Sequence, residues 1–376
     1  MSLSVGIVGL PNVGKSTLFN ALTRSKQADA QNYPFCTIDP NVGVVEVPDA
    51  RLQKLAEISK SQKIIPTVIQ FVDIAGLVKG ASEGEGLGNK FLSHIREVDA
   101  IVQVVRSFSD SNVTHVNNKV NPQEDADIIN LELALADLQT VTKKLDTVKR
   151  NAKGAAAKDW QKQIELFTGV EAQLQAGKPA RDLEYNEDET LWMKELQLLT
   201  MKPMLYVVNV DEANVTSPIV IPTEVEESLS SSLRDPSATL GMTDAPQIEI
   251  SAKLEAELAD LSAEEAKDYL KELGLEETGL DKLITASYKL LDLITFLTSG
   301  EPETRAWTVK RGAKAPEAAG VIHTDFVKGF VKADVVNWQD FVAAGGWNKI
   351  KETGKMRLEG KDYVLQDGDV CYFHIA

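Results

Sequence analysis

Short runs of apolar residues alternate with longer amphipathic stretches along most of the chain. Helical patterns separate most of these runs, and this alternation predicts an α/β fold with a mainly parallel sheet and helices on both faces. Ligands of such sheets bind beyond the carboxyl ends of the strands. The strand-like runs are Val5–Val8, Val42–Val47, Val68–Val72, Ile101–Val105, Met204–Val208 and Ile248–Ile250.

A different pattern covers residues 127–149, where apolar positions recur three and four residues apart, as in a heptad repeat. A break follows at residues 151–154, and a second helical stretch runs from about residue 155 to 176. We expect an antiparallel helical hairpin that projects from the α/β domain, with two ordinary packed helices as the alternative. The heptad-like positions are Ile128, Leu131, Leu135, Leu138, Thr142 and Leu145.

After residue 299 the pattern changes to short strand-like pieces with Gly-rich turns. Gly300-Glu301-Pro302 is typical of a boundary, and a small α+β domain of ~70 residues is predicted beyond it. The predicted strand-like pieces are Ala306–Val309, Gly320–His323, Phe330–Asp334, Tyr363–Leu365 and 367–375. The predicted domains are an α/β domain from residues 1–125 and 200–298, an inserted hairpin at 126–199, and a C-terminal domain at 299–376.

Composition narrows the class of protein. The chain has 376 residues and a formal net charge of -16, which argues against general coating of nucleic acid. A basic stretch at residues 143–153 is a local exception. No apolar run approaches the ~20 residues of a membrane span, and no signal peptide is visible. With Cys36 and Cys371 as its two cysteines, the chain fits a reducing compartment, so we expect a cytoplasmic protein with neither DNA nor membrane partners.

The segment from Gly9 to Ser16 matches the P-loop pattern G-x-x-x-x-G-K-[ST], between a predicted strand and a predicted helix. Its glycines let backbone N–H groups point at a phosphate chain, Lys15 reaches the β- and γ-phosphates, and the Ser16 hydroxyl can ligate Mg²⁺. The predicted nucleotide contacts in this loop are Asn12, Val13, Gly14, Lys15, Ser16 and Thr17.

Two further signals follow the P-loop in the order found in nucleotide switches. Asp73-Ile74-Ala75-Gly76 closes an apolar strand, so that Asp73 can hold Mg²⁺ and the Gly76 N–H can reach the γ-phosphate. Thr37 lies between the P-loop and Asp73 and is a candidate hydroxyl ligand from a loop that orders around a triphosphate. The predicted metal ligands are Ser16, Thr37 and Asp73.

The base-reading corner is predicted at Asn209-Val210-Asp211-Glu212, where G-domain switches carry Asn-Lys-x-Asp. Val210 replaces the Lys and Glu212 replaces the Asp, whose carboxylate normally accepts two hydrogen bonds from guanine. Without a well-placed carboxylate the guanine donors stay unpaired, so the corner should prefer ATP over GTP. Ser251-Ala252-Lys253 fits the last base-contacting loop. The alternative is a turn that uses Asn and Asp for backbone reasons.

On these motifs the chain resembles the YchF, or Obg-like ATPase, family of P-loop NTPases. The resemblance implies an Obg-type G domain with an inserted coiled-coil hairpin and a C-terminal TGS domain, a ubiquitin-like β-grasp. It also implies an ATPase that binds ribosomes and has links to stress and redox responses. The matching stretches are Gly9–Thr17, Asn32–Gly43, Asp73–Arg96, Leu131–Asp137, Asn209–Glu212, Ser251–Lys253, Lys314–Phe330 and Glu359–Phe373.

Several residues bear on catalysis and its regulation. Leu77 stands where many switches place a water-orienting Gln, so slow hydrolysis is expected. His115 is the candidate that the family suggests for positioning the water, with His94 as its rival, and either can be an ordinary surface residue. Asn12 suggests K⁺ binding against the phosphates. Cys36, beside Thr37, is a candidate redox site or a buried, inert thiol.

We therefore expect a switch that hydrolyses ATP slowly with Mg²⁺ and associates with the ribosome, through its large subunit or as a whole. The basic hairpin would contact ribosomal RNA, and such binding should weaken steeply with salt. One alternative is an Obg-class GTPase with relaxed base specificity. The other is a ribosomal adaptor that binds nucleotide for stability and scarcely hydrolyses it.

Overall fold

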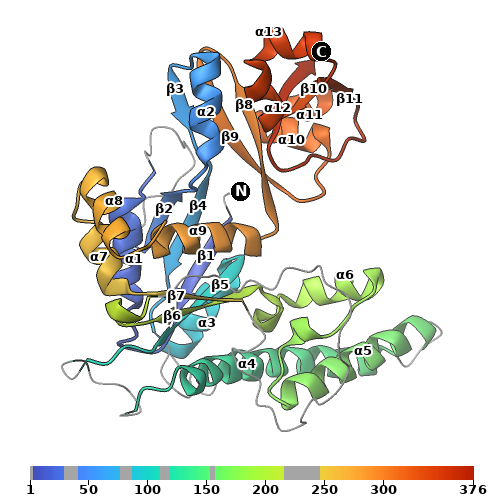
Figure 1. Cartoon of the computed structure of the whole chain (residues 1–376). Coiled ribbons are helices and arrows are strands. Elements are labelled where there is room, and N and C mark those ends of the chain that lie inside the picture. Colours follow the sequence, from blue (N-terminus) through green and yellow to red (C-terminus); the bar gives the residue numbers. More distant parts are fainter. Residues whose placement is uncertain are drawn as a thin grey trace, which may run out of the picture.

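Two six-stranded sheets organise the chain, whose computed structural model describes residues 3–28, 41–76, 87–110, 113, 119–152, 157–215 and 246–376 (Figure 1). The first sheet has the strand order β2-β4-β1-β5-β6-β7, and its neighbours run parallel except for β2, which is antiparallel to β4. The mainly parallel sheet is thus confirmed, and each strand overlaps a predicted apolar run. Its strands are β1 (Ser4–Val8), β2 (Val42–Glu46), β4 (Val68–Asp73), β5 (Ala100–Arg106), β6 (Met204–Asn209) and β7 (Gln247–Ile250).

Helices pack on both faces of this sheet. On one face, α1 brings the Phe19 ring to 3.3 Å from where a Cβ on Gly43 would lie. The strand register places Gly43 and Ala100 in the same row across the sheet. Gln103 lies three residues after Ala100 on β5, and because side chains alternate along a strand, it points to the opposite face. There its amide donates to the carbonyl of Ala126 on α4. The helices of this part are α1 (Lys15–Ser25), α3 (Leu87–Glu97), α7 (Ala252–Leu258), α8 (Ala263–Glu272) and α9 (Gly279–Leu290).

Helices α4 (Pro122–Asn151) and α5 (Ala157–Gln175) pack side by side and extend below the first sheet in Figure 1, with α6 (Glu187–Leu196) beside them. The predicted heptad seam is wrong, because Leu131 is 51% exposed. The first half of α4 buries a stripe in the core of the first sheet, and the second half buries a different stripe against α5. A helix that changes partner midway cannot keep one continuous seam. The two stripes are Ala126, Ile129, Leu133 and Ala136, and then Val141, Leu145 and Val148.

Asp137 joins α4 to the short 3₁₀ helix η3 (Leu199–Met201) that leads into β6. Its carboxylate accepts hydrogen bonds from the Leu199 N–H at 2.9 Å, the Thr200 N–H at 2.7 Å and the Thr200 hydroxyl at 2.7 Å. Burial raises the pKa of Asp137, and these hydrogen bonds oppose the rise. Helix α4 is therefore joined to the segment that leads into β6, the strand before the predicted base-reading corner. No helix within the described ranges is long and apolar enough to cross a membrane.

The second sheet has the order β11-β10-β12-β8-β9-β3, antiparallel except for the pairs β12–β8 and β3–β9. One face packs on α10 and α11, and the other face packs on α2, α12 and α13. Its strands are β3 (Lys63–Ile65), β8 (Leu293–Ser299), β9 (Glu303–Lys310), β10 (Phe330–Asn337), β11 (Arg357–Glu359) and β12 (Asp369–Ile375). Its helices are α2 (Ala50–Ser59), α10 (Ala315–Ile322), α11 (Asp325–Gly329), α12 (Trp338–Ala344) and α13 (Trp347–Ile350).

Three details of the C-terminal region differ from the sequence prediction. Residues Tyr363–Leu365, predicted as a strand-like piece, form no strand, and Val364 makes only an isolated bridge to Lys314. The strand predicted at Gly320–His323 is wrong, because α10 covers most of it. A Pro in the first turn, Glu317 accepting from the Lys314 N–H at 2.8 Å, and buried alanines one turn apart favour the helix. Gly300–Pro302, predicted as a boundary, forms the turn that joins β8 to β9, where the Gly300 N–H donates to Glu303.

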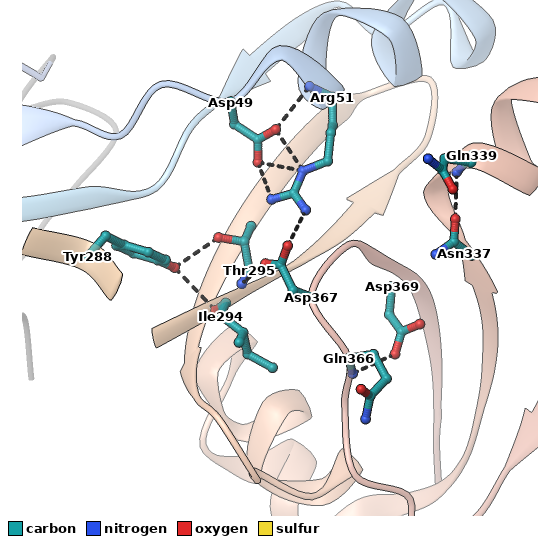
Figure 2. Close-up of polar contacts among 10 residues, drawn as sticks. All are labelled: Asp49, Arg51, Tyr288, Ile294, Thr295, Asn337, Gln339, Gln366, Asp367 and Asp369. Carbon is teal, nitrogen blue, oxygen red and sulfur yellow. Dashed lines mark hydrogen bonds and ion pairs between the residues drawn. The ribbon is translucent and has the colours of Figure 1, made fainter. Parts of the chain in front are cut away.

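The segment between β2 and β4 leaves the first sheet and supplies β3 and α2 to the second (Figure 1). Arg51 attaches this segment to the C-terminal region, as Figure 2 shows. Its guanidinium forms ion pairs with Asp49 at 2.7 Å and with Asp367 at 2.7 Å. The other oxygen of Asp367 accepts from the Thr295 N–H at 2.9 Å. Residues 49–65 and 293–298, predicted to belong with the first domain, therefore pack with the second sheet.

Candidate nucleotide-binding site

The P-loop lies at the carboxyl end of β1 and leads directly into α1, as its pattern requires. Gly14 is the N-cap of α1 and has a φ of 98°, a left-handed conformation that favours glycine. A Cβ there would lie 2.3 Å from Nδ2 of Asn209, and a Cβ on Gly9 would lie 2.5 Å from the Val104 carbonyl oxygen. Both glycines are thus required by close backbone approach. The N-terminus of α1 directs its N–H groups into the loop, which suits an anion.

Lys15 is held inside this loop with 8% of its surface exposed. Its Nζ donates to the Leu10 carbonyl at 2.7 Å. Burial lowers the pKa of the Lys15 ammonium to about 8, while the Asp73 carboxylate opposes the shift. A partly desolvated cation whose hydrogen bond goes to a neutral carbonyl is well suited to exchange that partner for phosphate oxygens.

The predicted metal ligands Ser16 and Asp73 are brought together by α1 and β4. The Ser16 hydroxyl donates to Oδ2 of Asp73 at 3.2 Å. One hydroxyl and one carboxylate oxygen at the mouth of a phosphate loop form the oxygen donor set that Mg²⁺ prefers, so the residues fit this ion. A Cβ on Gly76 would lie 3.0 Å from the Lys15 Nζ, which places the Gly76 backbone against the P-loop.

Asn209 connects the P-loop to the Ser251-Ala252-Lys253 loop. Its Nδ2 donates to the Val13 carbonyl at 2.9 Å, and its Oδ1 accepts from the Ala252 N–H at 2.9 Å. With 5% of its surface exposed, the side chain acts as a buried bridge. Its amide therefore positions the two loops, both predicted to bind nucleotide, relative to each other.

The residues after Asn209 are also engaged by the protein. Val210 is buried, and its N–H donates to Ile250 at 2.9 Å. Asp211 accepts from the Ser109 N–H at 3.3 Å. The Glu212 carboxylate forms an ion pair with Lys253 at 2.7 Å. Both carboxylates at this corner thus have partners within the chain.

A cavity of about 480 Å³ lies between this corner and the P-loop. Its volume lies within the range typical of small-ligand sites. Residues 108–110, which follow β5, form one wall, and residues 209–213 and 251–253 form the others. The lining residues are Gly14, Thr17, Phe108, Ser109, Asp110, Asn209, Val210, Asp211, Glu212, Ala213, Ser251, Ala252 and Lys253.

The wall after β5 was not predicted from the sequence. Its residues Phe108, Ser109 and Asp110 line the cavity, and the preceding Arg106 is buried with 2% of its surface exposed. One signal was available: Arg106 is a charged residue that ends an otherwise apolar strand. A buried charge needs hydrogen-bonding partners, so its position marks a loop with a specific structure.

The remaining predicted residues are distributed as follows. Thr37, Leu77, His115 and Cys36 lie outside the described residues. His94 lies on α3 and is exposed. The structure thus brings Lys15, Ser16, Asp73 and Gly76 into one group, and the predicted base-corner residues line the adjoining cavity.

Comparisons with known proteins agree with this geometry. Residues 4–144 match a family described as 50S ribosome-binding GTPase, and residues 293–376 match the YchF GTPase C-terminal family, described as a protein of unknown function. Proteins named "Ribosome-binding ATPase YchF" from Bacillus subtilis and Escherichia coli O157:H7 are 54% and 48% identical, each over 99% of both chains. A Schizosaccharomyces pombe structure described as a YchF GTPase is 36% identical, with a TM-score of 0.83 over 99% of this chain and 98% of that one.

Proposed function

The chain belongs to the YchF family, and on that premise we propose that it is a switch that binds and hydrolyses ATP with Mg²⁺ and associates with the ribosome. The observation that carries the choice of ATP is the composition of the base corner, where Glu212 and the buried Val210 stand in place of the Asp and Lys that read guanine. The relatives named above as ribosome-binding ATPases support the same choice.

Recognition of guanine needs a carboxylate that is free to accept two hydrogen bonds from the base. Here Glu212 is paired with Lys253 at 2.7 Å, and Asp211 accepts from the Ser109 N–H. An exposed ion pair is worth only about 0–1 kcal/mol, so pairing by itself does not exclude GTP. The larger effect comes from the longer Glu side chain and from the buried Val210 in place of Lys. A guanine in this cavity would leave donors unpaired, whereas adenine has no such donors.

Paired equilibrium titrations with ATP and GTP test this base preference. We expect the protein to bind ATP more tightly, and we expect the double variant Val210→Lys/Glu212→Asp to shift the ratio toward GTP. Glu257→Gln is the matched control, because Glu257 lies 3.8 Å from the same lysine but outside the cavity lining. Tighter binding of GTP by the unchanged protein would refute the proposal and favour the GTPase alternative.

For the reaction, Ser16 and Asp73 would hold Mg²⁺, with Thr37 as the third proposed ligand, and the bound ion would neutralise charge on the phosphates. Lys15 holds the β- and γ-phosphates, and the Gly76 N–H orients the γ-phosphate. Leu77 cannot orient a water, so turnover is slow. His115 is the proposed water-positioning residue and His94 the rival.

Single-turnover rates of His115→Ala and His94→Ala compare these two histidines. We expect the larger loss in His115→Ala, and a larger loss in His94→Ala would reverse the assignment. Retention of every cellular activity by Lys15→Ala would instead favour the adaptor alternative, in which hydrolysis is dispensable.

Ribosome association is proposed to use the basic end of α4. Lys143, Lys149 and Arg150 are exposed there, whereas Lys144 pairs with Glu195 at 3.1 Å. The exposed cations can contact phosphates of ribosomal RNA, which makes binding salt-dependent. We expect Lys143→Glu/Lys149→Glu to weaken co-sedimentation with ribosomes, whereas Lys267→Glu/Lys271→Glu on α8 should not. Equal effects of both pairs would remove the hairpin from the interface.

Two finer features complete the proposal. Asn12, with a φ of 65° in the P-loop, would favour K⁺ beside the phosphates, and equal turnover in Na⁺ and K⁺ buffers would refute this. Cys36, next to Thr37, would make turnover sensitive to oxidation. Hydrolysis that peroxide inhibits equally in Cys36→Ser would exclude that thiol.

A further inference from the structure

We propose that Arg106 is a positioning residue for the nucleotide base, because its guanidinium holds residues 108–110, which form one wall of the base cavity. The inference rests on the proposed function and adds to it the residue that holds this wall in place. It assigns part of the adenine affinity to a side chain that is absent from the cavity lining.

The contacts of Arg106 converge on this single short loop. Its Nε donates to the Phe108 carbonyl at 3.1 Å, its Nη2 to the Asp110 carbonyl at 3.1 Å, and its Nη1 to the Val113 carbonyl at 2.9 Å. Three carbonyls are therefore bound by one planar group whose donors point in fixed directions. The wall residues 108–110 take their backbone positions from these bonds.

The same guanidinium also supports an aromatic side chain of the wall. The Arg106 Cζ lies 4.3 Å from the centroid of the Phe108 ring, within the range of a cation–π contact. Phe108 lines the cavity and is partly exposed. Arg106 thus determines both the backbone of the wall and the placement of its largest side chain.

Two further hydrogen bonds attach the loop to the base-reading corner. The Ser107 N–H donates to the Asn209 carbonyl at 2.8 Å, and Asp211 accepts from the Ser109 N–H at 3.3 Å. Two walls of the cavity are consequently joined to each other. A loosened loop would change the width of the cavity without disturbing Lys15, whose contacts lie in the P-loop.

The cost of burying Arg106 argues that its position is selected for the loop. A guanidinium with 2% of its surface exposed is costly unless its N–H groups are paired. An apolar residue at the end of β5 would pack without that cost, but it would leave three loop carbonyls without these donors. A lysine has a single nitrogen and cannot reach the three carbonyls in one plane.

The test measures binding of ATP, GTP and inorganic tripolyphosphate by the full chain with Arg106→Lys and Arg106→Met. Tripolyphosphate occupies the P-loop without a base, so it separates the two parts of the site. We expect the affinity for ATP to fall about tenfold or more in both variants, and the ratio of ATP affinity to GTP affinity to decrease. The affinity for tripolyphosphate should stay within about twofold of that of the unchanged protein. Arg24→Met is the matched control, because Arg24 is 66% exposed and outside the cavity lining.

Unchanged ATP affinity in both variants would overturn the inference, and so would a parallel loss of ATP and tripolyphosphate, which indicates general damage. If Arg106→Met does not fold, the result for Arg106→Lys tests the inference alone, because lysine keeps the positive charge and loses the planar set of guanidinium donors. The unchanged protein provides a separate check on the proposed function. If it prefers GTP, the choice of ATP fails, while a loss of nucleotide but not tripolyphosphate affinity in Arg106→Lys would still support the wall assignment.

Discussion

The buried P-loop lysine predicts that nucleotide affinity decreases as the pH rises through about 8. Burial lowers the pKa of Lys15 to about 8 from its usual 10.5, so the cation that phosphates require is half lost at that pH. Bound phosphates favour the charged form and raise the pKa again. Binding above pH 8 must therefore include uptake of a proton, and the phosphate contact weakens as that proton becomes scarce.

The size of the effect follows from the shift. With a pKa of about 8, the apparent dissociation constant should rise about twofold at pH 8 and about elevenfold at pH 9, relative to the protein with Lys15 fully protonated. An elevenfold change corresponds to about 1.4 kcal/mol. The phosphates themselves titrate near pH 6, so the window above pH 7.5 reports on the protein.

ADP titrations from pH 7.5 to 9.5 measure this dependence, and calorimetry in two buffers of different ionisation enthalpy counts the proton, about half per site at pH 8. Adenosine is the control ligand, because it lacks phosphates and should bind with no inflection near pH 8. Asp73→Asn removes the carboxylate that raises the Lys15 pKa, so without metal its inflection should move to lower pH. An ADP affinity that stays constant across the window would refute the reasoning.

Three further predictions concern glycine geometry, the hairpin junction and a buried acid. Gly14→Ala should weaken ATP binding at least about tenfold, because the φ of 98° disfavours Ala and the new Cβ would displace Asn209. The control is Gly169→Ala, because Gly169 has open space around it, and equal ATP titration curves for the two variants would contradict the prediction. Asp137→Ala leaves three donors unpaired and should lower the free energy of unfolding, measured in urea, by about 3 kcal/mol. The control Asp146→Ala, at an exposed position, should change it by less than about 0.5 kcal/mol. A similar small change in both variants would show that Asp137 does not stabilise the contact between α4 and η3. Burial raises the pKa of Glu255 to about 7 from 4.5, so the folded state holds this proton more tightly and the free energy of unfolding should fall by up to about 3 kcal/mol as the pH rises from 4.5 through 7. Glu255→Gln should lack that part of the fall, and identical pH profiles in urea unfolding would show that Glu255 does not titrate in this range.

Local patterns carried much of what the sequence alone predicted. Each strand of the first sheet, the P-loop and the order of Asp73, Asn209 and Ser251 along the chain are properties of contiguous residues. Apolar runs predict strands because a strand buried on both faces needs apolar side chains throughout. The P-loop between β1 and α1 was predictable for the same reason, because its pattern is contained in eight neighbouring residues, Gly9–Ser16.

Only the tertiary structure decided which distant elements became partners. The excursion at residues 49–65 pairs with β9 through contacts about 240 residues away in sequence, which no local pattern encodes. Helix α4 buries one apolar stripe against the first sheet and a second stripe against α5, although the spacing of its apolar residues predicted a single seam. Asn209 and Arg106 bind carbonyls and N–H groups that chain folding brought to them. A side chain's type states which bonds it can make, but the backbone groups within its reach are set by the packing of the whole chain.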